Sequence, residues 1–263
     1  SGTGCHRSWG EHPFPMSGHD PRRVRGMCGP SRPTLATMTT PATSRSHLAF
    51  GIIALIAWGS LALNFVITAL GVYPSMNTDP TLLGSNISGF AGVMSRIFDF
   101  FTYFTILSNI VVGIVMTMLW RNPNRKGVVF RTLHLDALLM ISVTGLIYGV
   151  VLAGGAKLQG LEYVTNACEH YIVPILMVIV FIVYGPRGNF RVGTVFAALI
   201  LPIAWAFFAL IRGAAIGAYP YGFLNVAKLG LTSVIINIAM VAVLGIIIGF
   251  VYLLIDKLRS RKS

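Results

Sequence analysis

Residues 97–120, IFDFFTYFTILSNIVVGIVMTMLW, form the stretch that decides the fold. The stretch is long and apolar enough to cross a bilayer, which takes about 20 helical residues. Its first half also carries polar side chains, most of them at helical spacings of three or four: Asp99, Thr102, Thr105, Ser108 and Asn109. An unpaired polar group is costly in hydrocarbon, so such groups usually face a protein interior or a water-filled cavity. The stretch therefore predicts one wall of a polar chamber inside a helical bundle.

The composition of the whole chain agrees with a membrane location. Of its 263 residues 55% are hydrophobic and 11% charged, and the mean hydropathy is +0.75. These values exclude a soluble globular domain and indicate a polytopic membrane protein. The formal net charge of +12 does not point to nucleic acid, because the charges lie in tails and short loops around apolar runs. Three scattered cysteines, Cys5, Cys28 and Cys168, do not make a disulfide framework or a thiolate metal site.

Six apolar segments predict an all-α, six-helix transmembrane bundle occupying residues 47–256. The segments cover approximately residues 48–73, 97–120, 135–153, 166–184, 192–212 and 229–255. Pro174 and Pro202 fall inside the fourth and fifth segments and predict kinks there, since proline lacks the backbone N–H of a helical hydrogen bond.

Both ends of the chain lack a sustained hydrophobic period. Residues 1–46 are rich in Pro, Gly, Ser, Thr and Arg and predict a disordered basic tail. Met38 opens a simple leader into the first apolar segment, and we expect it to be the native start, with residues 1–37 not native. Residues 257–263 predict a short basic cytoplasmic tail.

The distribution of basic residues predicts the orientation in the membrane. Arg96, Lys157, Arg212 and Lys228 lie on one side of the predicted spans, and the other 16 of the 20 basic residues lie on the opposite side. Because Lys and Arg accumulate in cytoplasmic loops, both termini should be cytoplasmic. A multi-pass protein of the plasma (inner) membrane is the expected location.

The predicted outer ends of the spans collect polar and aromatic side chains that would line a substrate site. These candidate substrate-binding residues are Thr102, Asn109, Tyr148, Asn166, Arg212, Tyr219 and Tyr221. The two tyrosines of the 218–225 turn, AYPYGFLN, are typical of a membrane interface. Arg212 would hold a fatty-acid carboxylate or lipid phosphate, as guanidinium groups do well. The alternative is that Arg212 only extends its charged end to the interface.

Histidines divide between the two sides of the predicted bundle. His134 and Asp136 open the third segment on the cytoplasmic side, whereas His170 opens the fourth on the outer side. The hydrocarbon between them is about 30 Å thick, so they cannot share a metal ion, and we expect no metal site. His134 and Asp136 are interpreted as a cap of the third helix, where negative charge is favoured, with a proton relay as the alternative.

Thr105 and His170 are the candidate catalytic residues. Thr102, Thr105 and Asn109 share a helical face, and Asn166 precedes His170 by one helical turn, where it could fix the imidazole. A threonine nucleophile needs an adjacent base and donors for an oxyanion. The structural alternatives remain open: threonine hydroxyls in spans bond back to their own helix, and a histidine near a span end can be wetted at the interface.

Three phrases resemble a known family: FFTYFTILSN (100–109), NACEHYIVP (166–174), and RG (212–213) followed by AYPYGF (218–223). Over residues 48–255 the chain resembles a bacterial six-span membrane-protein family that is distantly related to the androgen-induced integral membrane proteins of animals. Those relatives are threonine hydrolases that cleave fatty acid esters of hydroxy fatty acids. The resemblance implies that Thr105 is the nucleophile and His170 the base, with Thr102 as a second candidate nucleophile.

The sequence therefore predicts a membrane-embedded hydrolase of lipid (fatty-acyl) esters. Thr105 would attack the ester, His170 would move the proton, and Asn109 or Asn166 would polarise the oxyanion. The expected partner is a membrane lipid or fatty-acid ester; no nucleic-acid partner and no cofactor are expected. The alternative is a non-catalytic lipid-binding or transport protein that uses the same polar pocket.

The orientation can be tested with an epitope tag at residue 263. In intact cells the tag should be inaccessible to a membrane-impermeant reagent, because the basic bias places this end in the cytoplasm. Permeabilised cells provide the positive control. Labelling of the tag from outside intact cells would overturn the predicted topology.

Overall fold

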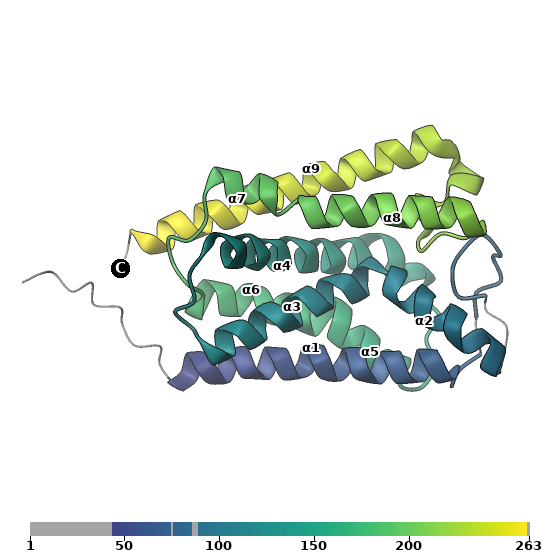
Figure 1. Cartoon of the computed structure of the whole chain (residues 1–263), viewed down its shortest axis with the longest axis horizontal. Helices are drawn as coiled ribbons and strands as arrows, with labels where there is room; N and C mark the ends of the chain where they lie inside the picture. Colours follow the sequence, from purple (N-terminus) through teal and green to yellow (C-terminus); the bar gives the residue numbers. More distant parts are fainter. Residues whose placement is uncertain (1–43, 75, 86–88, 262–263) are drawn as a thin grey trace, which may run out of the picture. The chain divides into compact units, whose positions relative to one another are not determined.

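The computed structural model describes residues 44–74, 76–85 and 89–261, which form a bundle of helices (Figure 1). In this described part of the chain, six helical segments are long and apolar enough to cross a membrane. They are Arg45–Leu70, Phe104–Arg121, Val128–Gly155, Glu162–Tyr184, Val192–Ile216 and Val226–Ser260. The described residues contain no named strand. The predicted all-α six-helix bundle is confirmed, and the protein is a multi-pass membrane protein.

Several spans are built from more than one helical piece. The first three spans are α1 (Ser44–Leu70), α3 (Phe104–Arg121), and α4 (Val128–Ile147) continued by η2 (Tyr148–Leu152) and η3 (Ala153–Gly155). The last three are α5 (Glu162–Ala167) with η4 (Cys168–Ile172) and α6 (Val173–Tyr184), then α7 (Val192–Ala197) with α8 (Ile200–Ile216), then α9 (Val226–Ser260). Outside the spans lie η1 (Phe90–Gly92), α2 (Val93–Thr102) and η5 (Gly222–Leu224).

Close approach between α1 and α3 holds one side of the bundle. A Cβ on Gly113 of α3 would lie 2.7 Å from the Trp58 ring of α1, so only a glycine lets the indole lie this close. The Trp58 indole N–H then donates to Thr117 Oγ1 at 3.1 Å. Lipid gives helices no hydrophobic reason to associate, so small residues and interhelical hydrogen bonds of this kind drive the packing.

The predicted boundaries need three corrections. The segment 97–120 is not one helix, because the chain is extended at Tyr103 (ψ 133°) between α2 and α3. The predicted transmembrane domain begins at 47, whereas α1 begins at Ser44; residues 1–43 of the predicted tail lie outside the described residues. The predicted basic tail 257–263 is helical as far as Ser260, where Lys257 and Arg259 favourably face the negative end of the α9 dipole.

Proline and glycine account for the other interruptions. The predicted kink near Pro202 is a break between α7 and α8, and Pro202 has no N–H to give the carbonyl of Ala198. Pro174 lies at the start of α6, directly after η4. A break that the sequence analysis missed lies at Gly230, where a φ of 75° interrupts α9.

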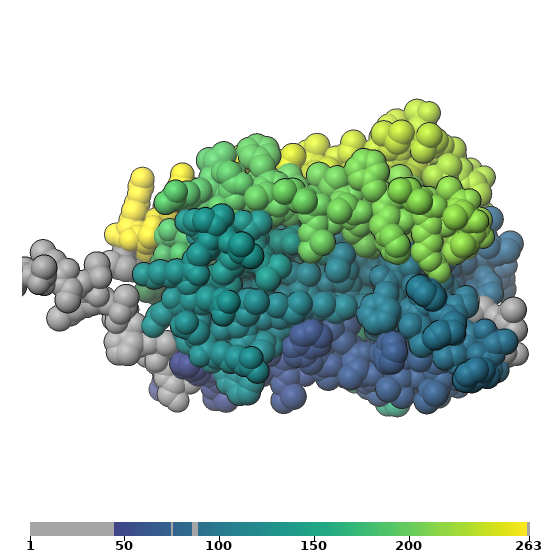
Figure 2. Space-filling model, viewed as in Figure 1, coloured from purple at the N-terminus to yellow at the C-terminus, as the bar shows by residue number. Residues whose placement is uncertain are grey.

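One end of the bundle, here called the site end, carries residues 71–74, 76–85, 89–103, 153–161 and 217–225 (right in Figure 1). A loop staple closes it: the N–H of Tyr219 donates to the carbonyl of Thr81 at 3.0 Å, and the N–H of Leu83 donates to the carbonyl of Tyr219 at 2.9 Å. Lys228 adds an ion pair with Asp79 at 2.5 Å. In Figure 2 the green atoms of α8 lie against blue atoms of the stretch around residue 100 at this end.

The Asp79–Lys228 ion pair makes a testable contribution to stability. Lys228, followed by Thr81, lowers the pKa of Asp79 from 3.8 to about 2. The folded state therefore gains stability above the unfolded pKa, and loses it as the pH falls from about 4 towards 2. Asp79→Asn should lower the melting temperature in detergent at pH 7, by a difference that shrinks at about pH 3.

The control for this measurement is Lys157→Gln, which removes an exposed cation at the same end and should leave the melting temperature unchanged. A pH-independent difference between Asp79→Asn and the parent protein would contradict an electrostatic origin.

Candidate functional site

The break at Tyr103 places Thr105 at the beginning of a helix, near the middle of a polar cluster. Thr105 is the second residue of α3, and its side chain is buried. The break leaves the carbonyl of Thr102 at the end of α2, where it accepts the indole N–H of Trp205 from α8 at 2.9 Å. This partner is 103 positions away in the chain, so the break depends on a tertiary contact.

Thr105 and His170 are in hydrogen-bond contact. The distance from Thr105 Oγ1 to His170 Nε2 is 3.1 Å, although the residues come from α3 and η4. His170 Nδ1 lies 3.2 Å from the backbone carbonyl oxygen of Asn166. A carbonyl can only accept, so a neutral imidazole held in this way carries its proton on Nδ1. The lone pair of Nε2 then faces the Thr105 hydroxyl, which is the arrangement of a nucleophile and its base.

Two π-helical segments in the described chain bring His170 and Tyr148 together. In η4 the N–H of Val173 donates to the carbonyl of Cys168, five residues back, and in η2 Ala153 donates to Tyr148 in the same way. The Tyr148 and His170 rings stack with centroids 3.8 Å apart. Such widened turns inside helices are frequent at functional sites, because they re-aim a side chain without ending the helix.

Close packing supports the turn that presents His170. Pro174 cannot donate to the carbonyl of His170, four residues earlier, so an ordinary α-turn is incomplete at this point. A Cβ on Gly145 of α4 would lie 3.2 Å from the same carbonyl oxygen. The glycine and the proline therefore let α4 and η4 approach where the imidazole needs support.

Asn109 positions both halves of the site. Its amide Nδ2 donates to the carbonyl oxygens of Thr105 at 2.9 Å and Glu169 at 3.2 Å. Ser108 Oγ also donates to the Thr105 carbonyl at 2.9 Å. Both amide hydrogens of Asn109 are used in these bonds. The side chain therefore has no donor left for an oxyanion, contrary to the prediction. Its role in the structure is to tie α3 to η4.

Asn166 fixes the imidazole as predicted. It does so through its backbone carbonyl, because the spacing of one helical turn aligns a carbonyl with the ring. Asn166 does not line the cavity around the threonine–histidine pair, so its side chain is not placed to polarise an oxyanion there. It lines a neighbouring cavity at the site end, which is described below as the outer vestibule.

A buried carboxyl group that the sequence analysis did not assign lies beside the pair. The Glu169 side chain is 1% exposed, and both of its oxygens accept from Asn64 Nδ2 of α1, at 3.1 and 2.9 Å. Thr68 Oγ1 in turn donates to Asn64 Oδ1 at 3.2 Å. Asn64 lies in a segment interpreted only as apolar; the signal that could have identified it is a lone amide in an otherwise hydrophobic span.

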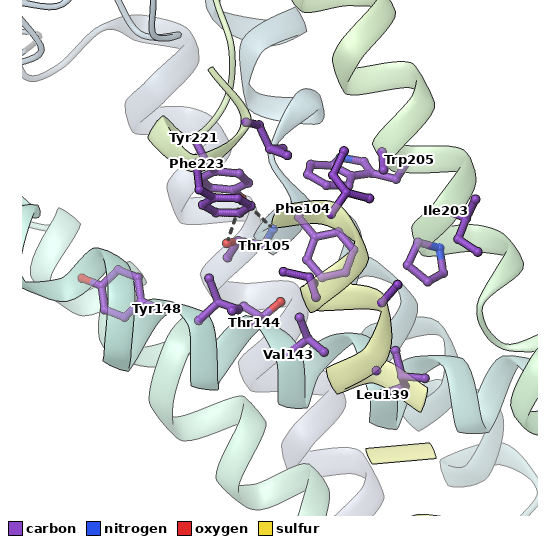
Figure 3. Close-up of a pocket in the computed structure, with 18 of the residues that line it drawn as sticks. Phe104, Thr105, Leu139, Val143, Thr144, Tyr148, Ile203, Trp205, Tyr221 and Phe223 are labelled. Atoms are coloured by element: carbon purple, nitrogen blue, oxygen red, sulfur yellow. Dashed lines mark hydrogen bonds between the residues drawn. The ribbon is translucent and has the colours of Figure 1, made fainter. Parts of the chain in front are cut away.

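Two cavities meet at Thr105, and a third adjoins them at the site end. The polar chamber holds about 610 Å³ of empty space, part of it open, and is lined by Asn64, Thr68, Phe100, Tyr103, Thr105, Ile106, Tyr148, Leu152, Glu169, His170 and Tyr221. The apolar pocket holds about 840 Å³, also partly open, and lies among side chains of α4, α8 and α9 (Figure 3). The outer vestibule is the larger cavity at the site end, lined in part by Lys157 and Asn166.

The pocket and the chamber meet at Thr105. Thr105, Tyr148, Leu152 and Tyr221 line both of them. Pocket walls such as Leu139 are apolar, so one side of Thr105 faces hydrocarbon-like space and the other faces polar groups. A lipid ester has the same division between its acyl chain and its ester group.

Of the predicted substrate-binding residues, Tyr148, Asn166 and Tyr221 line these cavities, and Thr102, Asn109, Arg212 and Tyr219 line none of the three. Thr102 Oγ1 bonds back to the carbonyl of Phe98 at 2.7 Å, which is the structural alternative considered for it. The ring of Tyr219 packs against Gly213 of α8, and its backbone makes the two hydrogen bonds of the loop staple.

Arg212 is paired with a carboxylate. Its Nη2 lies 2.6 Å from Asp99 Oδ1, and both side chains are largely buried. Asp99 Oδ2 also accepts the N–H of Gly84 at 3.3 Å. The pair therefore ties α2 and the 76–85 loop to α8, and the guanidinium is already occupied by an anion.

The predicted cap at His134 and Asp136 is wrong. Helix α4 begins at Val128, so both residues lie more than one turn inside the span, beyond the reach of its N-terminus. His134 packs among the rings of Phe130, Phe181 and Phe190, and neither ring nitrogen has a hydrogen-bond partner among the described residues. The pair is far along α4 from Tyr148 and does not join the site.

The described residues contain no group of three or more His, Cys, Asp or Glu side chains that could hold a metal ion. Comparisons of the chain with family models, curated proteins and solved structures find no match. The fold and the site thus define a polytopic membrane protein with a buried hydroxyl–imidazole pair, and the family resemblance stays a prediction from the quoted phrases.

The Asp99–Arg212 pair allows a stability prediction. Arg212→Met should lower the free energy of unfolding by about 3–5 kcal/mol, because it leaves a buried carboxylate without its counter-charge. Asp99→Leu combined with Arg212→Met should lower it by less, since no uncompensated charge remains. Denaturant unfolding in detergent measures both variants. A double variant less stable than Arg212→Met alone would contradict this account of the pair.

Proposed function

We propose that the protein is a membrane-embedded hydrolase of lipid (fatty-acyl) esters in which Thr105 is the nucleophile and His170 the general base. The observation that carries the proposal is the 3.1 Å contact between Thr105 Oγ1 and His170 Nε2, with Nδ1 held by a carbonyl. This pair lies where an apolar pocket meets a polar chamber. The plasma membrane, with the site on its outer side, is the proposed location, on the basis of the basic-residue bias.

The first half of the reaction forms an acyl-threonine. Thr105 Oγ1 bonds to the ester carbonyl carbon while its proton passes to His170 Nε2, and the carbonyl electron pair moves onto oxygen. When this oxyanion collapses, the bond from carbon to the alcohol oxygen breaks. His170 Nε2 returns the proton to the departing alkoxide, so the alcohol leaves neutral.

The second half consumes one water molecule. Water attacks the acyl carbon, gives a proton to His170 Nε2, and the regained proton restores the Thr105 hydroxyl as the fatty acid leaves. The polar chamber adjoins the outer vestibule, with Tyr103 and Tyr148 lining both, which gives water and the alcohol a route. The apolar pocket gives the acyl chain a separate place.

A lipid-binding or transport protein remains the competing function, because the same apolar pocket suits an acyl chain. The hydroxyl–imidazole contact favours the hydrolase, since binding alone requires no base on the threonine. A lipophilic fluorophosphonate probe separates the two functions. The hydrolase should take up the probe covalently on Thr105, whereas a lipid binder should leave it unreacted.

Thr105→Ala and His170→Ala should each lower ester hydrolysis by at least roughly 100-fold, since each removes one member of an acting pair. The double variant should be scarcely worse than either, because residues that work as a unit are grossly non-additive. Thr105→Ser should keep part of the activity, and Thr102→Ala most of it. Hydrolysis and melting temperature are measured together in detergent.

Thr117→Ala is the matched control, since it removes a threonine hydroxyl from the same helix away from the chamber. Folded Thr105→Ala and His170→Ala proteins that still hydrolyse esters at the parent rate would show that the assigned site is wrong.

A further inference from the structure

The proposed reaction needs a donor for the oxyanion, and the structure offers one from the 217–225 loop. Tyr221 OH lies 3.5 Å from Thr105 Oγ1 and accepts the backbone N–H of Thr105 at 3.3 Å. Both dashed lines in Figure 3 run from the Tyr221 hydroxyl to Thr105. We infer that Tyr221, together with the backbone N–H of Thr105, forms the oxyanion hole of this site; the inference rests on the proposed ester hydrolysis.

The hydrogen bonds around Thr105 fix the direction in which Tyr221 donates. His170 Nε2 accepts the Thr105 hydroxyl proton, so Thr105 Oγ1 has lone pairs left to accept and no second proton to give. In its contact with Thr105 Oγ1, Tyr221 is therefore the donor. Its O–H therefore lies beside the attacking oxygen, next to the place where the carbonyl oxygen of a bound ester takes up negative charge.

The position of Tyr221 relative to α3 supports the same role. Thr105 is the second residue of this 18-residue helix, whose first N–H groups carry the positive end of the helix dipole. In the structure the Tyr221 oxygen accepts the backbone N–H of Thr105, which is the position that a carbonyl oxygen of the substrate would take. An ester carbonyl oxygen that enters beside them can accept from the fixed Thr105 N–H and from the Tyr221 O–H, which are two donors from different elements.

The Tyr221 ring is held in place before any substrate arrives. It stacks on Phe223 at 5.4 Å with an interplanar angle of 3°, and it meets Tyr103 edge-on at 5.8 Å. The loop is anchored by the Tyr219–Thr81 and Leu83–Tyr219 hydrogen bonds of the staple. Asn237 of α9 donates to the carbonyl of Phe223 at 2.8 Å. A donor fixed in this way needs little reorganisation at the moment of reaction.

Tyr221 also remains a donor over a wide pH range. Burial raises the pKa of its phenol above the usual value of 10.0, against the hydrogen bonds to Thr105 and Phe104, which lower it. The phenol therefore stays protonated at neutral pH. Tyr148 and Tyr221 both line the chamber, and each contacts one member of the pair. Tyr148 stacks on the His170 imidazole, and the Tyr221 hydroxyl points at Thr105 Oγ1.

A purely structural role would make Tyr221 a cap for α3 and nothing more. Tyr103, the N-cap residue of α3, makes no side-chain hydrogen bond to the helix. The backbone N–H of Thr105 is in the first turn of α3 and has no acceptor within that helix, and the Tyr221 hydroxyl accepts it instead. Such a cap would affect stability and all ligands alike. An oxyanion donor would affect the transition state alone, and this difference can be measured.

The test compares Tyr221→Phe with the parent protein in detergent, using a long-chain fatty-acyl ester as substrate. We expect kcat to fall by roughly 100-fold, as for other oxyanion donors, with KM changed little. Tyr163→Phe, which removes a hydroxyl from an exposed tyrosine at the same end, should keep the parent rate. A kcat within about threefold of the parent protein would overturn the inference.

A second measurement, of inhibitor affinity, tests the inference even if Tyr221→Phe lowers the stability of the protein. A long-chain alkyl trifluoromethyl ketone adds to the nucleophile and generates an oxyanion, whereas the matching secondary alcohol occupies the same pocket without one. Tyr221→Phe should lose affinity for the ketone by about the factor lost in kcat and bind the alcohol as the parent does. Equal losses for ketone and alcohol would show a structural cap and overturn the inference.

Thr105→Ala in the same assays separates this inference from the proposed function. If parent and Thr105→Ala proteins hydrolyse the ester and bind the ketone equally, the proposed function fails and the oxyanion hole fails with it. If Thr105→Ala abolishes both while Tyr221→Phe changes neither, the hydrolase assignment holds and Tyr221 alone is excluded.

Discussion

The site depends on one constraint, which is that a backbone in hydrocarbon must satisfy its hydrogen bonds inside the protein. A helix that ends inside the bundle needs partners for its free backbone groups, and the break between α2 and α3 at Tyr103 has two of them. Trp205 donates to the carbonyl of Thr102 on one side of the break, and Tyr221 accepts the N–H of Thr105 on the other. These two contacts stabilise the break and with it the position of Thr105 at the start of α3.

Two other irregular segments also lie at the chamber. The π-turns η2 and η4 carry Tyr148 and His170, which stack on each other. Each widened turn shifts the following residues around the helix axis relative to a regular α-helix. Regular spans would satisfy the backbone equally well, so the chain departs from regularity at the place where chemistry would need a particular side-chain direction.

The sequence predicted the architecture because the membrane imposes length and polarity on each span. Six apolar runs of spanning length were sufficient to predict an all-α bundle. Thr105 and His170 were identified as candidates from their helical faces and from the family resemblance. Their 3.1 Å contact was not predictable, because it depends on how deep α3 and η4 sit against each other.

What the sequence analysis missed lies in tertiary contacts. Asn109 was predicted to polarise an oxyanion, but both of its amide hydrogens are used by carbonyls, which no local pattern reveals. Asn64 escaped notice because one amide hardly changes the hydropathy of a span. Arg212 was assigned to an anionic lipid, and its anion in the structure is Asp99, on the same predicted stretch that opened the sequence analysis.

The division of space around Thr105 connects the fold to the proposed chemistry. Tyr221 lines the apolar pocket, the polar chamber and the outer vestibule, and Thr105 lines the first two. An acyl chain in the pocket would hold its carbonyl carbon near Thr105 Oγ1, while the alcohol part and water approach from the polar side. Holding reacting groups together in this way removes much of the entropic barrier to their reaction. The bundle would then contribute to catalysis by separating the two halves of the substrate as well as by supplying a nucleophile and a base.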